Sequence, residues 1–241
     1  MSSRVFADRR EAGRLLGARV VEFLSAPGGN IKTSGGIRTS GGITTGQGPD
    51  APLVLGLARG GVPVAREVAD AHCASLGPCD LDVLVVRKIG APGHAEFAMG
   101  ALTADHLVVN DDVPRRLGVS HSVFDEVADR ERRLLRARER RYRGERPRVE
   151  PAGRSVVLVD DGLATGSSMA VAIDSVRSAG ASSVIVAVPT APADSPGRLR
   201  DRGVTGFVVL TTPDPFRAVG LSYDDFGQVD DDEVIAALDR G

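Results

Sequence analysis

Thirteen consecutive residues constrain the fold of this chain more than any other segment. Residues 156–168 read Val-Val-Leu-Val-Asp-Asp-Gly-Leu-Ala-Thr-Gly-Ser-Ser. The four apolar residues are typical of a buried strand, and the small polar residues lead into a segment with helical spacing that stops at Gly180. The segment therefore predicts a strand, a short loop and a helix, with Asp160 and Asp161 at the carboxyl end of the strand.

The same alternation continues through most of the chain. Amphipathic or apolar helical spacing covers residues 9–24, 63–73, 120–143 and 167–179, and short apolar runs occupy residues 53–57, 81–86, 107–109, 155–159, 184–188 and 207–210. Strands that alternate with helices are typical of the α/β class, in which a mainly parallel sheet has helices on both faces. We interpret residues 1–241 as a single domain of this class.

One segment departs from that pattern. Residues 28–48 form three imperfect six-residue repeats rich in Gly, Ser and Thr, and eight of these 21 residues are glycine. Such a composition buries too little apolar surface to offset its ordering entropy, which favours a flexible insertion. The regular Ile and Thr residues leave open a lid or a short strand ladder over a site.

Composition argues against several classes of function. The chain has 32 acidic and 30 basic residues, and its arginine-rich stretch at 130–148 also contains glutamates, so a nucleic-acid partner is not expected. The apolar runs are far shorter than the roughly 20 residues of a membrane span. Cys73 and Cys79 form neither a zinc pattern nor a disulfide framework, which fits a reduced cytoplasmic compartment.

The loop after the 155–159 strand combines two kinds of binding chemistry. Asp160 and Asp161 offer carboxylate acceptors for vicinal hydroxyls, and the helix start offers backbone N–H groups for a phosphate. The residues expected around that phosphate are Ala164, Thr165, Gly166, Ser167 and Ser168. Together they suit a sugar phosphate. The segment matches neither the Walker nor the Gly-x-Gly-x-x-Gly pattern, and acidic residues that merely cap a helix remain the alternative.

These thirteen residues resemble the phosphoribosyl diphosphate (PRPP) signature of the type I phosphoribosyltransferases. The resemblance implies that Asp160 and Asp161 bind the ribose hydroxyls and that Ala164 to Ser168 bind the 5-phosphate. It also implies Mg²⁺ between the diphosphate and the ribose hydroxyls, which the two aspartates would reach indirectly. Residues 56–63 look like the diphosphate loop of the family, in which Arg59, Gly60 and Gly61 would face the anion.

The resemblance extends to two further segments. Arg87 and Lys88 follow the 81–86 strand, where the family has basic residues that face the diphosphate, and Lys88 is one of only two lysines. Residues 90–100 occupy the position of the mobile catalytic loop. Within that loop, His94 and Glu96 could move a proton, so they join Lys88 as catalytic candidates. A surface loop with solvent-facing side chains is the alternative.

In this family a hood covers the acceptor, and residues 211–241 would form it here. Its aromatic residues Phe216, Tyr223 and Phe226 would either stack on a planar base or pack the hood against the sheet. Hypoxanthine and guanine enzymes have an acidic residue where this chain has Ala164, which argues against a 6-oxopurine acceptor. The pattern is most similar to a subgroup of uncharacterised phosphoribosyltransferase-like proteins.

The implied reaction is transfer of a 5-phosphoribosyl group from PRPP to a nitrogen nucleophile, with release of diphosphate. The expected partners are PRPP and a small-molecule acceptor, and a homodimer is compatible with the resemblance. A PRPP-binding regulatory protein without transferase activity shares the same signature and stays open. A phosphohydrolase is less favoured because no further metal-spaced cluster accompanies the aspartates.

Overall fold

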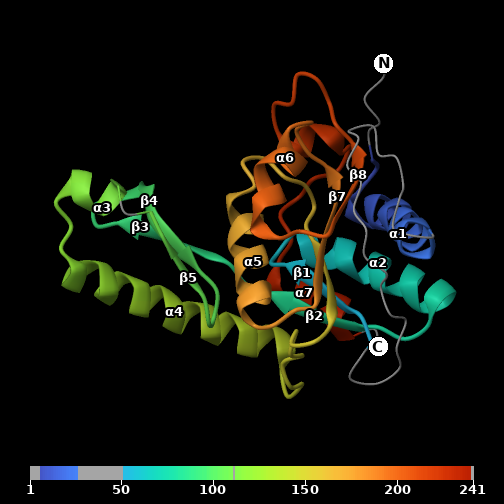
Figure 1. Ribbon diagram of the computed structural model, residues 1–241, viewed down its shortest axis with the longest axis horizontal. Helices are drawn as coiled ribbons and strands as arrows, with labels where there is room; N and C mark the ends of the chain where they lie inside the picture. Colours follow the sequence, from blue (N-terminus) through green and yellow to red (C-terminus); the bar gives the residue numbers. More distant parts are fainter. Residues whose placement is uncertain (1–5, 27–50, 111, 240–241) are drawn as a thin grey trace.

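Five parallel strands form the centre of the structure, a computed structural model that describes residues 6–26, 51–110 and 112–239 but not the side chains of Ala95 and Glu96 (Figure 1). The strands are β1 (Leu53–Leu57), β2 (Asp80–Leu84), β6 (Ser155–Val159), β7 (Ser183–Thr190) and β8 (Gly206–Thr211). Their order across the sheet is β2-β1-β6-β7-β8, and every neighbouring pair is parallel. The expected parallel α/β sheet is confirmed. The predicted insertion at 28–48 lies outside the described residues.

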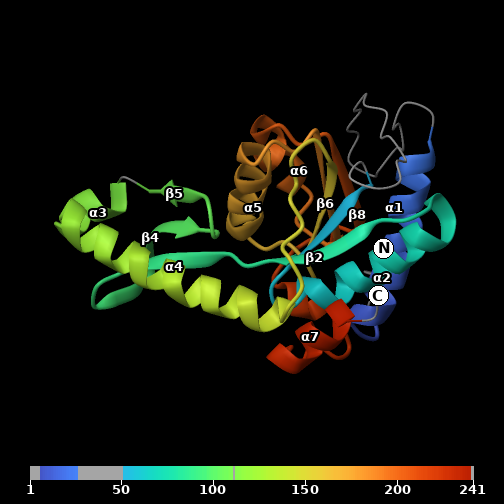
Figure 2. The same ribbon diagram turned by 90° about the horizontal axis from the view of Figure 1, so that it is seen from below.

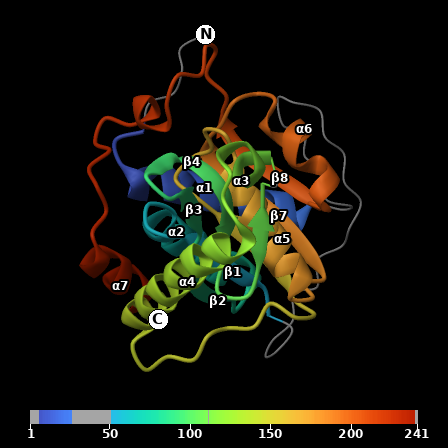
Figure 3. The ribbon, with the colours of Figure 1, turned by 90° about the vertical axis from the view of Figure 1, so that its left-hand side faces the viewer.

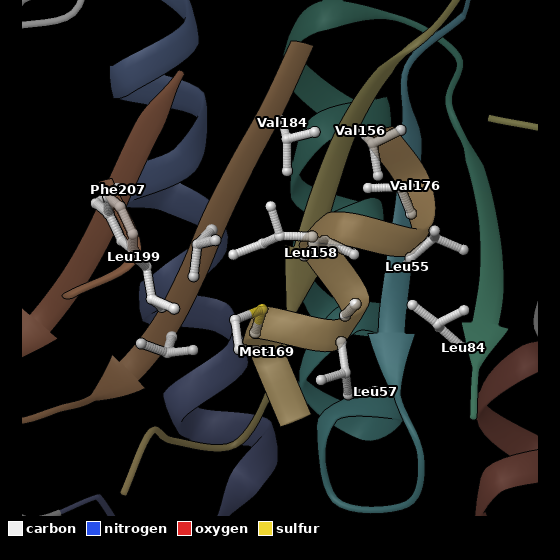
Figure 4. Packing of buried hydrophobic residues seen from close by; sticks show 14 of the residues in the cluster. Leu55, Leu57, Leu84, Val156, Leu158, Met169, Val176, Val184, Leu199 and Phe207 are labelled. Carbon is white, nitrogen blue, oxygen red and sulfur yellow. The ribbon is translucent and has the colours of Figure 1, made fainter. Parts of the chain in front are cut away.

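Helices cover both faces of this sheet. Helices α1 (Arg9–Ser25) and α2 (Gly61–Leu76) lie on one face and α5 (Ser167–Ser178) on the other (Figure 2). Because side chains alternate along a strand, Leu158 packs with Met169 of α5, whereas Val157 packs with the α1 and α2 side (Figure 4). All residues of β1 and β6 are buried, which explains why these strands are almost entirely apolar, with Ser155 at the start of β6 as the exception.

The segment predicted as a mobile loop at 90–100 is instead part of a second sheet. Strands β3 (Arg87–Ala91), β4 (His94–Leu102) and β5 (Leu107–Val109) are antiparallel and project from the main sheet (Figures 1 and 2). A Cβ at Gly100 would lie 2.3 Å from the carbonyl oxygen of Val108. Glycine at this position therefore permits close strand pairing. From the sequence alone, a glycine that serves this purpose cannot be distinguished from the hinge of a mobile loop.

A further boundary was predicted wrongly at the preceding strand. The apolar run at 81–86 was expected to end at Arg87 and Lys88, but β2 ends at Leu84. Arg87 and Lys88 therefore open β3 of the projecting sheet, three and four residues after the end of β2. Val85 is buried although it belongs to neither strand. The apolar run therefore continues past the end of β2, and the end of the run does not mark the end of the strand.

Helix α4 (His121–Arg143), which follows the short α3 (Asp112–Leu117), joins the projecting sheet to the main body. Near its end, the guanidinium of Arg143 donates to the buried carboxylate of Asp82 over 2.8 Å and to the carbonyl of Val83 over 2.7 Å. Other arginines of the 130–148 stretch pair with Asp129 and Asp231, as expected for a structural and solvated face. This attachment fixes the C-terminal end of α4 against β2.

The C-terminal segment closes over the end of the main sheet. After α6 (Ser195–Leu199) and β8, it forms the 3-10 turn η3 (Val219–Ser222) and helix α7 (Asp231–Asp239), which lies beside the end of α4 (Figure 3). Phe6 and Tyr223 form a parallel bridge that joins the start of the described chain to the C-terminal segment. Helices α3, α6 and α7 were not predicted because each is short. Among the helices described, none has the length and apolar character to cross a membrane.

Candidate functional site

The direction of the chain crossovers reverses between β1 and β6. From β1 the chain passes through α2 to β2 on one side, and from β6 it passes through α5 to β7 on the other. Gly56 is paired with Val159, so the loops that follow β1 and β6 leave the sheet next to each other. The carboxyl ends of strands at such a reversal are where open α/β sheets bind ligands. Both loops that the sequence singled out lie here.

These two loops are in direct contact. A Cβ at Gly60 would lie 2.0 Å from Oδ2 of Asp161, and one at Gly61 would lie 2.6 Å from the carbonyl oxygen of Val159. The peptide bond between Ala58 and Arg59 is cis. Only glycine allows the first turn of α2 to approach the aspartate pair this closely. The predicted diphosphate loop and the predicted ribose-binding residues are thus brought together.

Two helices begin at this site, and both begin at a glycine. The N-cap residues of α2 and α5 are Gly60 and Gly166, neither of which has a side chain to bond the first-turn N–H groups. By contrast, Asp8 and Ser120 cap α1 and α4 with their side chains. Two helix N-termini without side-chain caps combine N–H donors with positive dipole ends, which favours anions.

The predicted phosphate loop has a compact form. Gly166 has a φ of +77°, in the left-handed region that favours glycine, and this residue turns the chain into α5. The hydroxyl groups of Thr165 and Ser167 are 2.6 Å apart, and the N–H of Ser167 donates to Thr165 Oγ1 over 3.4 Å. Ala164, Thr165 and Ser167 are all exposed, so a ligand can reach the loop.

The carboxylate pair carries an electrostatic cost that Arg9 offsets only in part. Burial and the neighbouring Asp161 raise the pKa of Asp160 well above its ordinary value, although Asp160 Oδ1 accepts the N–H of Asp161 over 2.9 Å. Burial also raises the pKa of Asp161, and the hydrogen bond and charge of Arg9 oppose that rise. A hydroxyl donor or a cation would relieve this cost, which is what a ribose or Mg²⁺ offers.

The three predicted basic residues, Arg59, Arg87 and Lys88, have different surroundings. Arg59 is next to Gly60, and its Nη1 lies 4.0 Å from Oδ1 of Asp231 in α7. Arg87 is committed to Glu131 of α4, to which its Nε donates over 2.7 Å. Lys88 is exposed, and the alternation of side chains along β3 places it on the face opposite Arg87. The Arg87 guanidinium is therefore paired with a carboxylate, whereas Arg59 lies beside Gly60 at the start of α2.

His94, one of the proposed proton-transfer residues, lies in the second sheet and not in either loop at the crossover reversal. His94 opens β4 at the turn from β3, where its ring meets Phe97 edge-on at 6.0 Å between centroids. The turn belongs to the part of the second sheet that projects from the main body (Figure 1). The side chain of Glu96 lies outside the described residues. Their catalytic roles stay predictions.

Three residues near the site were not expected from the sequence. Arg9 of α1 donates from Nε to Asp161 Oδ2 over 2.8 Å, Arg198 of α6 donates to the carbonyl of Ala164 over 3.4 Å, and Asp231 of α7 faces Arg59. Each comes from a helix remote in sequence from the loop that it contacts. No local motif marks such residues, because only the folded chain brings them near the loops.

Two of the three candidate stacking aromatics pack within the protein. Tyr223 stacks on Phe226 with 4.9 Å between ring centroids, and its hydroxyl donates to the main-chain carbonyl of Asp161 over 2.6 Å. Tyr223 also contacts the buried ring of Phe6. Phe216 is half-buried. The C-terminal segment thus contacts the site through hydrogen bonds as well as apolar packing.

Comparisons with known proteins agree with this geometry. Residues 44–225 match the model of the phosphoribosyl transferase domain, and the chain belongs to that family. This match includes both loops at the crossover reversal.

Similar proteins are known from two bacteria. The crystal structure of TT1426 from Thermus thermophilus is 41% identical, with a TM-score of 0.70, and the alignment covers 97% of each chain. Rv0571c of Mycobacterium tuberculosis, whose name assigns it provisionally to the phosphoribosyl transferases, is 41% identical over 239 residues. That alignment covers 98% of this chain and 47% of Rv0571c. The chain therefore spans about half the length of this curated relative.

Proposed function

We propose that this protein transfers a 5-phosphoribosyl group from PRPP to a nitrogen nucleophile and releases diphosphate. One observation carries the proposal: a pair of carboxylates and two glycine-capped helix N-termini meet at the reversal between β1 and β6. Few ligands carry vicinal hydroxyls between two separate phosphate groups, and PRPP is one that does.

Each part of PRPP has a complementary part of the site. The 5-phosphate would bind at the start of α5, on residues 164–168, and the diphosphate at the start of α2, on Arg59, Gly60 and Gly61. Asp160 and Asp161 would accept hydrogen bonds from the ribose hydroxyls. Charge-assisted bonds of this kind are stronger than neutral ones, so this arrangement favours a ribose with free hydroxyls.

The aspartate pair also fits an indirect role toward Mg²⁺. Within the described part of the chain, no group of three or more His, Cys, Asp or Glu residues could hold a metal ion. Two carboxylates with substrate oxygens and water suit Mg²⁺, which usually keeps several waters. When bound, the ion would offset the negative charge of the leaving diphosphate. Asp160 and Asp161 would orient the ribose from the other side.

The protein has little covalent chemistry to perform in such a transfer. Positive charge that develops at C1 of the ribose would be stabilised by the nearby carboxylates, and departing charge by the helix N-termini and Arg59. The acceptor is proposed to be a small molecule with a ring or amine nitrogen. Ala164 offers no carboxylate to an acceptor at the position just before Thr165.

Release of diphosphate separates the transferase from a protein that only binds PRPP. We expect Mg²⁺-PRPP and a panel of nitrogen acceptors to give PRPP-dependent diphosphate release with the wild-type chain. In Glu96→Ala this release falls at least about tenfold while PRPP binding is retained, because general acid–base catalysis contributes roughly 10²–10⁴-fold. Glu126→Ala, which changes an exposed glutamate of α4, leaves it unchanged.

Two other results would redirect the proposal. Tight PRPP binding without diphosphate release for any acceptor would favour the PRPP-binding regulator. Equal release by Glu96→Ala and the wild type would remove Glu96 from the mechanism and leave the donor site in place.

A further inference from the structure

Arg9 contacts both the carboxylate pair and the C-terminal segment. Its Nε donates to Asp161 Oδ2 over 2.8 Å, and its Nη1 donates to the carbonyl of Gly227 over 2.7 Å. Its guanidinium carbon lies 4.0 Å from the centre of the Phe226 ring. Only 13% of the Arg9 side chain is exposed. The guanidinium is therefore held by both the loop after β6 and the C-terminal segment.

The same C-terminal segment also holds the main chain of Asp161. The hydroxyl of Tyr223 donates to the Asp161 carbonyl, and the Tyr223 ring stacks on Phe226. Phe6 completes the assembly, because its N–H donates to Ser222 and its carbonyl accepts from Asp224. Asp161 is thus fixed at its carboxylate by Arg9 and at its backbone by Tyr223.

The contacts of Arg9 and Tyr223 with Asp161 determine which carboxylate oxygen of Asp161 can bind a ligand. Arg9 occupies Oδ2, which is also the atom nearest to Gly60 of the predicted diphosphate loop. The second oxygen, Oδ1, is then the acceptor that can face a hydroxyl group. The charge of Arg9 offsets the repulsion between the adjacent carboxylates at short range. Loss of Arg9 would free the Asp161 side chain to rotate and would leave two like charges unbalanced.

We propose that Arg9 is a positioning residue that fixes the Asp161 carboxylate for the ribose hydroxyls of PRPP. The proposal rests on the donor site described above and assigns a new role to the first turn of α1. Arg9 acts through Asp161 and does not itself touch the sugar. Because Arg9 also contacts Phe226 and Gly227, the position of the Asp161 carboxylate depends on the C-terminal segment.

A double-mutant cycle on ligand binding tests this role. PRPP with Mg²⁺ is titrated into the full chain as wild type, Arg9→Met, Asp161→Asn and the double variant. We expect Arg9→Met to weaken binding about 10–30-fold, comparable with the loss of a hydrogen bond to a charged group. In the Asp161→Asn background the same change has less than about a threefold effect, because Arg9 has no carboxylate left to position.

Two further variants separate positioning from general stability. Arg9→Lys keeps the charge and recovers part of the lost affinity, and it serves in the cycle if Arg9→Met does not fold. Arg14→Met makes the matched change at an exposed arginine of α1 and leaves PRPP affinity unchanged. Thermal unfolding of each variant establishes that the titrated protein is folded.

Distinct outcomes overturn the inference. If Arg9→Met lowers the melting temperature but binds PRPP like the wild type, Arg9 is only structural. If Arg9→Met weakens binding equally in both backgrounds, Arg9 does not act through Asp161. If the wild-type chain itself binds no PRPP, the proposed donor fails, and the assignment of Arg9 fails with it.

Discussion

Replacing both aspartates of the site, as Asp160→Asn/Asp161→Asn, is expected to weaken PRPP binding by at least about 100-fold. Each carboxylate would contribute a charge-assisted hydrogen bond to a ribose hydroxyl, worth about 1.5–3 kcal/mol. Two such bonds correspond to about two to four powers of ten in affinity. Calorimetric titration measures this loss directly. Retention of wild-type affinity would show that the carboxylates do not bind the sugar.

The single variant Asp160→Asn is expected to lose affinity while the ligand-free protein becomes more stable. Because burial raises the pKa of Asp160, the folded protein holds its proton to higher pH than the unfolded chain. Stability of the wild type therefore falls as pH rises from the unfolded pKa, about 3.9, through the folded pKa. Asparagine does not ionise, so the Asp160→Asn variant avoids the cost of a buried negative charge. The melting temperature of the variant should therefore exceed that of the wild type by a margin that grows as pH rises through that window. A constant difference across the window would contradict this account.

Substitutions in the loop after β1 are expected to have large and distinguishable effects. In Gly60→Ala the new methyl group would meet the Asp161 carboxylate and displace this side chain from its hydrogen bond with Arg9, without moving the backbone. The protein should fold and bind PRPP at least about tenfold more weakly, because the displaced carboxylate loses its alignment. In Gly61→Ala the methyl group meets the backbone of β6, which cannot move in this way. We expect Gly61→Ala to destabilise the fold by about 1–3 kcal/mol.

Gly197→Ala provides the control for these changes. A Cβ at Gly197 of α6 would meet nothing within 4 Å, and its φ is not positive. Its melting temperature and PRPP affinity should match those of the wild type. Chemical denaturation and titration of the three variants measure both properties. If Gly60→Ala binds PRPP normally, the contact between the two loops has no functional role.

The core of the fold was predictable because its signals are local. In β6, four apolar residues precede two aspartates, and α5 begins at the small residues that follow. The predicted helix at 120–143 matches α4, which is capped by Ser120. Apolar period, helix caps and turn glycines all act within a few residues of each other, so a single sequence contains them.

The remainder depended on contacts between distant parts of the chain. Gly90 and Gly100 resemble the hinges of a loop, yet the second sheet recruits both for strand pairing. Arg87 was expected beside Lys88 as part of an anion site, but Glu131 of α4 binds it. Arg9 and Asp161 are 152 residues apart in sequence and 2.8 Å apart in space. Nothing in their neighbouring residues indicates that pairing.

Titration of PRPP into the wild-type chain, with and without Mg²⁺, tests whether the loops after β1 and β6 bind PRPP. We expect Mg²⁺-dependent binding that ribose 5-phosphate and inorganic diphosphate each weaken by competition, because the two would occupy the starts of α5 and α2. A protein of known PRPP affinity serves as the positive control. If the folded chain gives no binding under conditions where that control binds, the crossover reversal between β1 and β6 is not a PRPP site.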